Sequence, residues 1–310
     1  MRFSRLIFTL LFVFLFGVQS SEAAHKRHRR SPAKKTTPAR KPAVAAAASQ
    51  LKPIVSDDPD DLVVAARGAI VLDALSGKSL YEKNADTRFY PASTTKIMTG
   101  LLVIEAGNLD QVVEVTLEDS KVGESSLNIH PGDRFTRRQM LFGLMLKSAN
   151  DVAHALGRDN AGSIEAFAKK MTLRAKELGC TNTQFANPHG LHNLGHYTTP
   201  RDLASITRTA MNQPLFRQIV STKTAQWSTA TGGLMLTNHN RLLDKFAGCN
   251  GVKTGYTIPA QQVLASSAAR DGKEAIAIVM HTDKPGIWED SAKLLEFGLR
   301  KCGASPVAGK

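Results

Sequence analysis

Apolar residues follow one pattern at the two ends of the folded part and another pattern between them, and this order is what most constrains the fold. Residues 66–84 ("ARGAIVLDALSGKSLYEKN") and 261–281 ("QQVLASSAARDGKEAIAIVMH") each contain two apolar runs separated by a glycine-containing turn, the pattern of an antiparallel hairpin. Between them, apolar residues recur at spacings of three and four, which is typical of helices. We therefore predict an α/β (α+β) fold in which both ends of the folded part build one antiparallel sheet. Helices flank this sheet, and a mainly helical lobe is inserted at about residues 100–245.

Several helical segments can be placed individually. The middle of the chain contains four of them, at residues 137–146, 150–159, 163–179 and 199–212. The last of the four opens with Thr199-Pro200, which is a typical helix start. Residues 290–302 are amphipathic and are predicted to form a closing helix that packs on the sheet.

Residues 1–23 are predicted to be a secretory signal peptide. Two arginines among the first five residues precede an apolar run that is too short for a comfortable membrane span. Ser21 and Ala23 then flank Glu22 in the small-x-small pattern of a cleavage site, which we place after Ala23. An uncleaved membrane anchor is the alternative interpretation.

Residues 24–61 are predicted to be a basic, disordered tether. Within them, residues 25–52 contain nine lysines and arginines, three prolines, no acid and no aromatic residue, which leaves too little apolar surface to order the segment. Because the chain is exported, we expect anionic wall polymers, lipid head groups or acidic polysaccharide as partners of this segment, and no nucleic acid. Of the formal net charge of +13, residues 1–24 contribute +1 and residues 25–52 contribute +9, which leaves +3 for the remainder. The folded part is therefore close to neutral.

The cysteines give little information about the fold. Cys180, Cys249 and Cys302 are too few for a disulfide scaffold, and nothing in the sequence selects a pair for a single bridge. No Cys-x-x-Cys motif is present, so a zinc site built on thiolates is poorly supported.

Ser93 and Lys96, in "YPASTTKIM" (90–98), are a candidate nucleophile and base. Pro91 favours an extended approach to a helix start, and in the first turn of a helix a residue at i+3 lies on the same face. The Lys96 side chain can then reach the Ser93 hydroxyl. The apolar residues that follow predict a buried helix, in which desolvation lowers the pKa of Lys96 towards the range where a neutral amine acts as a base.

Two further stretches carry residues of the same kind of site. "KSAND" provides Ser148 and Asn150, a hydroxyl and an amide, at a break between two helical segments. "CNGVKTGYT" provides Lys253, Thr254 and Gly255 at the start of a predicted strand, and Lys-Thr-Gly occurs nowhere else in the chain.

The order Ser-x-x-Lys, Ser-x-Asn, Lys-Thr-Gly resembles the signature of the penicillin-recognising serine acyltransferases. More narrowly, the chain is similar to the low-molecular-mass penicillin-binding proteins of the D-alanyl-D-alanine carboxypeptidase family. The motifs that carry this similarity are "YPASTTKIMTG", "GESSLNIHPGDRFTRRQMLFGLMLKSANDVA", "FANPHGL", "HYTTPRDLA", "TNHNRLL" and "GVKTGYT". The similarity covers residues 62 to 302, and it implies a β-lactamase/transpeptidase-like catalytic domain at 62–303 followed by a tail at 304–310.

The resemblance also implies an activity. The expected reaction is removal of the terminal D-Ala from peptidoglycan stem pentapeptides by a serine peptidase that β-lactams inhibit. The expected location is periplasmic or cell-wall associated, after secretion across the inner membrane. No metal or organic cofactor is implied.

By the same resemblance, Ser93 is the nucleophile that forms an acyl-enzyme, and Lys96 takes its proton. Ser148 relays a proton towards the departing amine, while Asn150 orients Lys96 and the substrate amide.

The Lys-Thr-Gly segment is expected to bind the substrate. Lys253 sets the electrostatics of the cleft and Thr254 hydrogen-bonds the terminal carboxylate. Gly255 lets the substrate backbone approach, because it has no side chain. The backbone N–H groups of Ser93 and Tyr256 are expected to form the oxyanion hole.

The sequence departs from the family pattern in three places. The basic residue that often assists the substrate carboxylate is not clearly placed, and Arg270 and Lys273 are the candidates. No Glu-x-x-Leu-Asn element is present, so penicillin is expected to acylate Ser93 and to be released slowly. The sequence reaches its end near the last predicted helix, without the β-rich domain and amphipathic anchor of many carboxypeptidases, which weakens the case for a membrane-tethered enzyme.

Three alternative functions remain at this stage. A D,D-endopeptidase would cleave cross-links between stem peptides with the same residues. A wall-binding module would retain the fold without the reaction. A metallopeptidase would use His189, His192 and His196, but the chain contains no His-Glu-x-x-His motif, and loop histidines are usually solvated.

Overall fold

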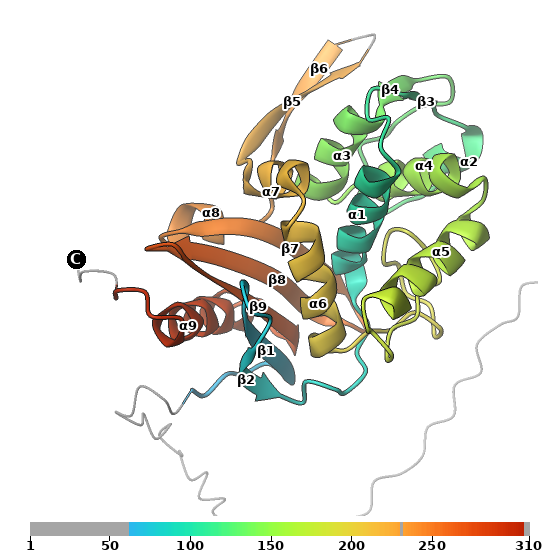
Figure 1. Cartoon of the computed structure of the whole chain (residues 1–310). Coiled ribbons are helices and arrows are strands. Elements are labelled where there is room, and N and C mark those ends of the chain that lie inside the picture. Colours follow the sequence, from blue (N-terminus) through green and yellow to red (C-terminus); the bar gives the residue numbers. More distant parts are fainter. Residues whose placement is uncertain (1–61, 230–231, 307–310) are drawn as a thin grey trace, which may run out of the picture. The chain divides into compact units, whose positions relative to one another are not determined.

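The main sheet takes its strands from both ends of the folded chain (Figure 1). The structure, a computed structural model, describes residues 62–229 and 232–306, all of which belong to one unit, Val55–Lys310. The sheet has the order β2-β1-β9-β8-β7, and every neighbouring pair is antiparallel. Its strands are β1 (Gly68–Asp73), β2 (Ser79–Lys83), β7 (Cys249–Thr257), β8 (Gln261–Arg270) and β9 (Lys273–Thr282). Ile70 of β1 lies opposite Ile278 of β9, so the N-terminal and C-terminal hairpins form one sheet, as predicted.

The turn between β8 and β9 explains the register at the C-terminal end of the sheet. Asp271 and Gly272 have φ angles of 52° and 71°, so both adopt the left-handed conformation that a two-residue hairpin turn favours. Strand β7 pairs with the other side of β8, with Thr254 opposite Leu264. It is therefore an edge strand, and one side of its backbone is free of sheet neighbours.

Helices cover both faces of the sheet. Helix α9 (Gly286–Lys301) packs against β8, β9 and β1, and it is the predicted closing helix. Helix α6 (Pro200–Met211) packs against β9 and β1 from the other face. Accordingly, alternate residues of β1 belong to different cores, with Val71 on the α9 side and Ile70 on the side of the other helices. Because both faces are covered, β8 and β9 are almost continuously buried and do not alternate with polar residues.

The predicted helices of the middle region are confirmed. They are α3 (Arg137–Leu146), α4 (Asn150–Ala161), α5 (Ile164–Glu177) and α6. At the start of α6, the Thr199 hydroxyl accepts a hydrogen bond from the Asp202 backbone N–H at 3.1 Å, and Pro200 occupies the first turn. The remaining helices are η1 (Ala92–Thr95), α1 (Lys96–Ala106), α2 (Leu117–Ser120), α7 (Pro214–Ser221) and α8 (Leu242–Lys245).

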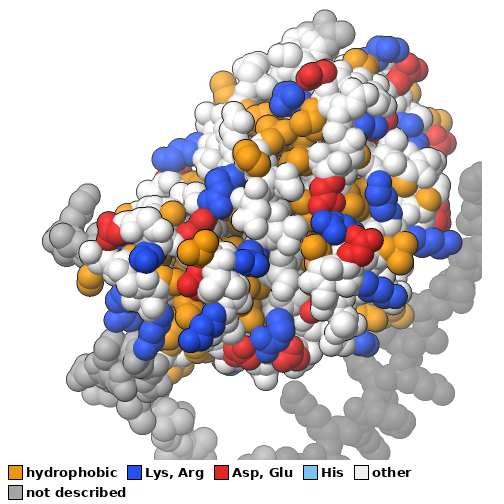
Figure 2. Space-filling view, viewed as in Figure 1, with side chains coloured by type: hydrophobic (Ala, Val, Ile, Leu, Met, Phe, Trp, Pro, Cys, Tyr) orange, Lys and Arg blue, Asp and Glu red, His pale blue; other side chains and the backbone are white. Residues whose placement is uncertain are grey.

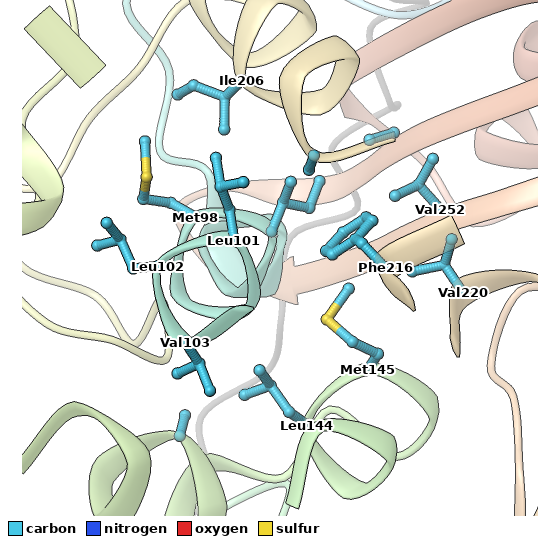
Figure 3. Close-up of a cluster of buried hydrophobic side chains, with 14 of the residues drawn as sticks. Met98, Leu101, Leu102, Val103, Leu144, Met145, Ile206, Phe216, Val220 and Val252 are labelled. Atoms are coloured by element: carbon cyan, nitrogen blue, oxygen red, sulfur yellow. The ribbon is translucent and has the colours of Figure 1, made fainter. Parts of the chain in front are cut away.

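Helix α1 lies at the centre of the larger core. Its first eight residues, 96 to 103, are all buried. Figure 3 shows side chains of α1, among them Met98 and Leu101, in a cluster with side chains from four other elements, namely Leu144 and Met145 of α3, Ile206 of α6, Phe216 and Val220 of α7, and Val252 of β7. Each large apolar side chain buried in this way stabilises the fold by about 1.5–3 kcal/mol. The N-terminal end of α1 is therefore held from several directions at once.

Two small two-stranded sheets within the middle region were not predicted from the sequence. They are β3–β4 (Val112–Glu114 and Arg134–Thr136) and β5–β6 (Thr224–Thr229 and Gly232–Thr237), and the second extends away from the helices (Figure 1). Trp227 of β5 is buried and packs on Phe135 of β4, with ring centroids 4.6 Å apart. Three-residue strands such as β3 and β4 are too short to show a period of two, so tertiary contacts of this kind define them.

Basic and acidic side chains are interspersed over the face shown in Figure 2. This distribution agrees with the small net charge of the folded part. Within residues 62–229 and 232–306, no helix is long and apolar enough to cross a membrane. Cys180, Cys249 and Cys302 are all free thiols. The predicted signal peptide at 1–23, the tether at 24–61 and residues 307–310 of the tail lie outside the described residues.

Candidate active site

Ser93 lies in η1, the single turn that leads into the buried helix α1. This turn packs against β7 and β8, so it faces the edge of the main sheet. The Nζ atom of Lys96, at the first position of α1, is 3.0 Å from the Ser93 Oγ atom. The i+3 spacing therefore places the two groups at hydrogen-bond distance, as the sequence predicted.

Lys96 is fully buried and has two further partners. Its Nζ atom donates to the Asn150 side-chain oxygen at 2.7 Å and to the His189 backbone carbonyl at 2.6 Å. Burial, assisted by the positive charge of Lys253, holds the pKa of Lys96 well below its usual value. A neutral amine is thus favoured, and its position beside Ser93 is determined by two fixed oxygen atoms.

Ser148 lies in the short connection between α3 and α4, and Asn150 directly follows this connection. Ser148 has a φ angle of 62°, which is unusual for a residue other than glycine, and it is a buried residue that, together with Ser93, lines a cavity that we call the cleft. Asn150 is the first residue of α4, and its side-chain nitrogen donates to the Gly123 carbonyl at 3.1 Å. This bond directs the Asn150 oxygen towards Lys96. The backbone N–H of Asn150 also donates to the Ser125 carbonyl, which ties the 123–125 segment to the site.

The Lys-Thr-Gly segment lies on edge strand β7, on the other side of the cleft. Lys253 is 2% exposed, and its Nζ atom donates to the Thr254 carbonyl at 2.8 Å. Burial lowers the pKa of Lys253 to about 7. Two lysines with lowered pKa values therefore lie behind one cleft.

Gly255 has a role within the protein that sequence analysis did not suggest. A Cβ atom at this position would lie 2.9 Å from the Ser93 backbone nitrogen and 3.1 Å from the Ala92 Cβ atom. The missing side chain thus gives room to the nucleophile turn of the protein itself. The expected approach of the substrate backbone to Gly255 stays a prediction.

The loop before α6 supports the same turn from another side. A Cβ atom at Gly190, whose φ angle is 91°, would overlap the Ala92 carbonyl oxygen. In this loop His196 is buried, and its Nδ1 atom accepts from the Ala186 N–H, so its Nε2 atom donates to the Thr95 hydroxyl at 2.8 Å. Burial lowers the pKa of His196 to about 3, so the imidazole is neutral.

The other histidines of this loop have separate partners. The Nδ1 atom of His189 accepts from the Leu191 N–H, and the His192 ring packs edge-on against Tyr90. In the part of the chain that the structure describes, no group of three histidine, cysteine or acidic side chains is arranged to hold a metal ion.

A cavity of about 520 Å³ opens in front of these residues. Five of the eight predicted site residues line it: Ser93, Ser148, Thr254, Gly255 and Tyr256. The other three, Lys96, Asn150 and Lys253, are buried next to them. The structure therefore brings all eight predicted residues together.

Several other lining residues were not assigned by sequence analysis. They are Ser125, Asn238, His239, Arg241, Gln262, Lys284 and Trp288. The quoted motifs "GESSLN" and "TNHNRLL" contained Ser125, Asn238, His239 and Arg241, although no role was given to them. No sequence signal pointed to Gln262, Lys284 or Trp288.

The basic residues of the cleft differ from those expected. Arg270 lies at the far end of β8, where it pairs with Glu296, and Lys273 begins the next strand. Neither residue lines the cavity, so both candidates were wrong. Arg241 and Lys284 line it instead, and the Arg241 guanidinium lies 5.7 Å from the centre of the Trp288 ring.

The arrangement has the parts of an acyl-transfer site. A serine hydroxyl is available as a nucleophile, a desolvated amine beside it can accept the proton, and two cationic side chains line the same cavity.

Comparison with known proteins agrees with this chemistry. The profile of the D-alanyl-D-alanine carboxypeptidase family matches residues 54–284. The chain is 35% identical to D-alanyl-D-alanine carboxypeptidase DacF of Bacillus subtilis over 256 residues, which cover 80% of this chain and 65% of that protein. It is 37% identical to a D-alanyl-D-alanine carboxypeptidase of Streptomyces sp. strain K15, covering 76% of this chain and 88% of that protein. The chain thus spans slightly less than two thirds of the Bacillus relative and most of the Streptomyces one.

Solved structures give the same result. The crystal structure of the Streptomyces K15 DD-transpeptidase superposes with a TM-score of 0.73 at 36% identity, covering 77% of this chain and 98% of that one. A putative penicillin-binding protein homolog from Mycobacterium tuberculosis superposes with a TM-score of 0.75 at 30% identity, covering 80% and 96%. The fold predicted from the sequence is therefore confirmed.

Proposed function

The chain belongs to the D-alanyl-D-alanine carboxypeptidase family of penicillin-binding serine peptidases, and we propose that it removes the terminal D-alanine from peptidoglycan stem pentapeptides. The observation that carries this proposal is the position of Lys96, which is fully buried with its Nζ atom 3.0 Å from the Ser93 Oγ atom and 2.7 Å from the Asn150 oxygen.

In the first half of the reaction, neutral Lys96 takes the Ser93 hydroxyl proton. The Ser93 oxygen then bonds to the carbonyl carbon of the penultimate D-Ala. Collapse of the tetrahedral intermediate breaks the bond to the terminal D-Ala nitrogen, which receives the proton of Lys96 through Ser148, so Lys96 is neutral again. The product is an ester between Ser93 and the shortened peptide.

In the second half, water attacks that ester. Lys96 accepts the proton of the water and returns one to the Ser93 oxygen, so the enzyme is regenerated. A β-lactam enters the same first half, but its leaving nitrogen stays attached to the acyl group, and it is released slowly.

The backbone N–H groups of Ser93 and Tyr256 are the oxyanion donors in this scheme. Two contacts support this assignment: η1 packs directly on β7, and Gly255 lies against the Ser93 backbone nitrogen. A lost oxyanion donor typically costs about 2.7–4 kcal/mol of transition-state stabilisation.

The substrate carboxylate is bound by Thr254, with Arg241 and Lys284 as the cationic partners. All three residues line the cavity, and a carboxylate there would neutralise part of its positive charge. Lys253 lies behind Thr254 and contributes to the same positive potential.

Mass spectrometry of isolated peptidoglycan fragments tests the proposal, with the mature wild-type protein beside Ser93→Ala. Loss of one alanine from pentapeptide stems, absent in the variant, is the expected result. Conversion of cross-linked dimers to monomers would instead identify a D,D-endopeptidase, and formation of new cross-links would identify a transpeptidase, the activity for which the Streptomyces K15 DD-transpeptidase is named. If none of these changes occurs, the chain is a wall-binding module.

The proposal includes the organisation of the chain. Residues 1–23 direct export, residues 24–61 associate with anionic wall or membrane surfaces, and residues 62–303 form the catalytic domain, which places the enzyme in the periplasm or at the cell wall. The net charge of +9 in residues 25–52 supports the association with anionic surfaces. Fractionation of cells that produce the full chain, followed by N-terminal sequencing, tests both the location and the cleavage after Ala23.

A further inference from the structure

A second cavity, of about 360 Å³, lies on the surface between the segment before Ser93, the loop before α6 and the ends of two strands of the main sheet. We call it the arginine–aromatic pocket. It is defined by Arg67, Arg88, Phe89, Tyr90, Tyr197 and His281. None of these residues takes part in the reaction proposed above.

The charge of this pocket is unbalanced. No acidic residue lines it, and neither of its two arginines forms an ion pair with any residue that the structure describes. The Arg67 guanidinium lies 3.4 Å from the His281 ring nitrogen, and the Arg88 guanidinium donates to the Asn182 side-chain oxygen at 3.2 Å. Most arginines of the described region bind carboxylates instead, as Arg201 does with Glu82. Two exposed guanidinium groups without an anion therefore face one cavity.

The pocket is also preorganised. The Arg88 guanidinium is stacked over the Tyr197 ring, 4.3 Å from its centre, so one face of the cation is fixed while the N–H groups that do not bind Asn182 point to the edges of the guanidinium plane. Tyr90 is held edge-on by the His192 ring at 4.7 Å. Beside these rings, Leu194 is 81% exposed. A ligand that fits this surface carries an oxyanion next to an apolar or ring-shaped part.

The pocket and the Ser93 cleft are neighbours. Tyr256 and Gln262 line the cleft, whereas Pro259, in the turn between them, lines the pocket. On the other side, Tyr90 of the pocket is three residues before Ser93. One extended polymer can therefore occupy both cavities by passing over the β7–β8 turn.

Resting on the proposed function, we propose that the arginine–aromatic pocket binds a second anionic segment of the wall polymer, while the Ser93 cleft holds a stem peptide. The recognised chemistry is a carboxylate or phosphate oxyanion carried on a peptide or saccharide. Such a site raises the local concentration of stem peptides at Ser93 without contacting the scissile bond.

The test compares a short soluble peptide that ends in D-Ala-D-Ala with intact insoluble peptidoglycan. The proteins are the mature wild type, the pocket variant Arg67→Gln/Arg88→Gln and the control Arg134→Gln/Arg138→Gln. The control removes the same charge from exposed arginines that form surface ion pairs outside both cavities. Thermal unfolding of each protein checks that the fold is intact.

We expect the pocket variant to hydrolyse the short peptide like the wild type and intact peptidoglycan about 10-fold more slowly, since two charge-assisted contacts are lost. The control should behave like the wild type on both substrates. The proposal would be overturned if the pocket variant and the control hydrolysed peptidoglycan at equal rates. It would also be overturned if the pocket variant lost the same fraction of its hydrolysis rate on both substrates.

Binding measurements separate this proposal from the proposed function. If the wild type does not hydrolyse the short peptide, the proposed function fails, but co-sedimentation of the Ser93→Ala protein with peptidoglycan still reports on the pocket. Peptidoglycan stripped of phosphate-bearing polymers distinguishes the two sources of the oxyanion, because only a phosphate ligand is lost by stripping. Weaker binding of the pocket variant to anionic lipid vesicles, with unchanged binding to peptidoglycan, would assign the pocket to a membrane and overturn the proposal.

Discussion

The α-carbon of Gly255 faces the backbone nitrogen of Ser93 so closely that a Cβ atom on Gly255 would lie 2.9 Å from that nitrogen. The edge strand and the nucleophile turn are therefore in direct backbone contact. Because the Ser93 N–H is one of the two proposed oxyanion donors, this contact sets the position of a group that stabilises the transition state.

The Gly255→Ala substitution is expected to slow acylation of Ser93 by about 10- to 100-fold, because the added methyl group displaces the Ser93 N–H from the oxyanion. Labelling by a fluorescent penicillin over time measures this rate. Gly132→Ala is the control, since a Cβ atom there would meet nothing within 4 Å and Gly132 does not line the cleft. If both variants are labelled equally fast, the contact between Gly255 and Ser93 does not position the donor.

The Lys96→Arg substitution is expected to lower the acylation rate by about 100-fold or more, although it preserves the positive charge. Arginine stays protonated at any accessible pH and cannot take the Ser93 proton. In the wild type, the acylation rate should rise with pH as the fraction of neutral Lys96 grows. Stopped-flow labelling with penicillin across a pH series measures both effects, and a Lys96→Arg variant with a wild-type rate would remove Lys96 from the role of base.

The lowered pKa of Lys253 predicts how the free energy of unfolding depends on pH. Its pKa is lowered to about 7 in the folded protein, whereas the unfolded chain keeps a value near 10.5. Between these pH values the unfolded state binds one more proton, so stability rises with pH in this window and stays at its lower level below pH 7.

Replacing Lys253 by methionine removes the additional proton that the unfolded state binds in this pH window. The variant is expected to be more stable than the wild type at pH 7 by at least about 1 kcal/mol, and the difference should shrink towards pH 10. Urea unfolding at several pH values measures this difference. A constant difference across the window would show that the proton linkage of Lys253 is not the cause.

Arg241 and Lys284 are expected to select substrates by their terminal carboxylate. The double substitution Arg241→Gln/Lys284→Gln should lower kcat/KM for a peptide acid by about 10-fold or more, through the loss of charge-assisted hydrogen bonds. The same peptide with a C-terminal amide should be unaffected, because it offers no charge to these residues. Steady-state kinetics with this pair of peptides measures the effect, and equal losses on acid and amide would argue against carboxylate recognition.

Much of the fold was predictable because its signals are local. The turn residues Asp271 and Gly272, the cap at Thr199 and the two periodicities act over a few residues, so the sheet, helices α3 to α6 and helix α9 could be placed in advance. The two-stranded sheets β3–β4 and β5–β6 could not, since their strands are defined by contacts such as that between Trp227 and Phe135.

For the site, the sequence by itself determined which residue types were present and that Lys96 follows Ser93 by one helical turn. Only the tertiary structure decided what surrounds them. The burial that lowers the pKa of Lys96, the approach of Gly255 to Ser93, and the placement of Arg241 and Lys284 in the cleft in place of Arg270 all depend on residues far apart in the chain. Desolvation and close backbone contact are properties of a packed interior. No local sequence pattern specifies which distant segments will form that interior around the site.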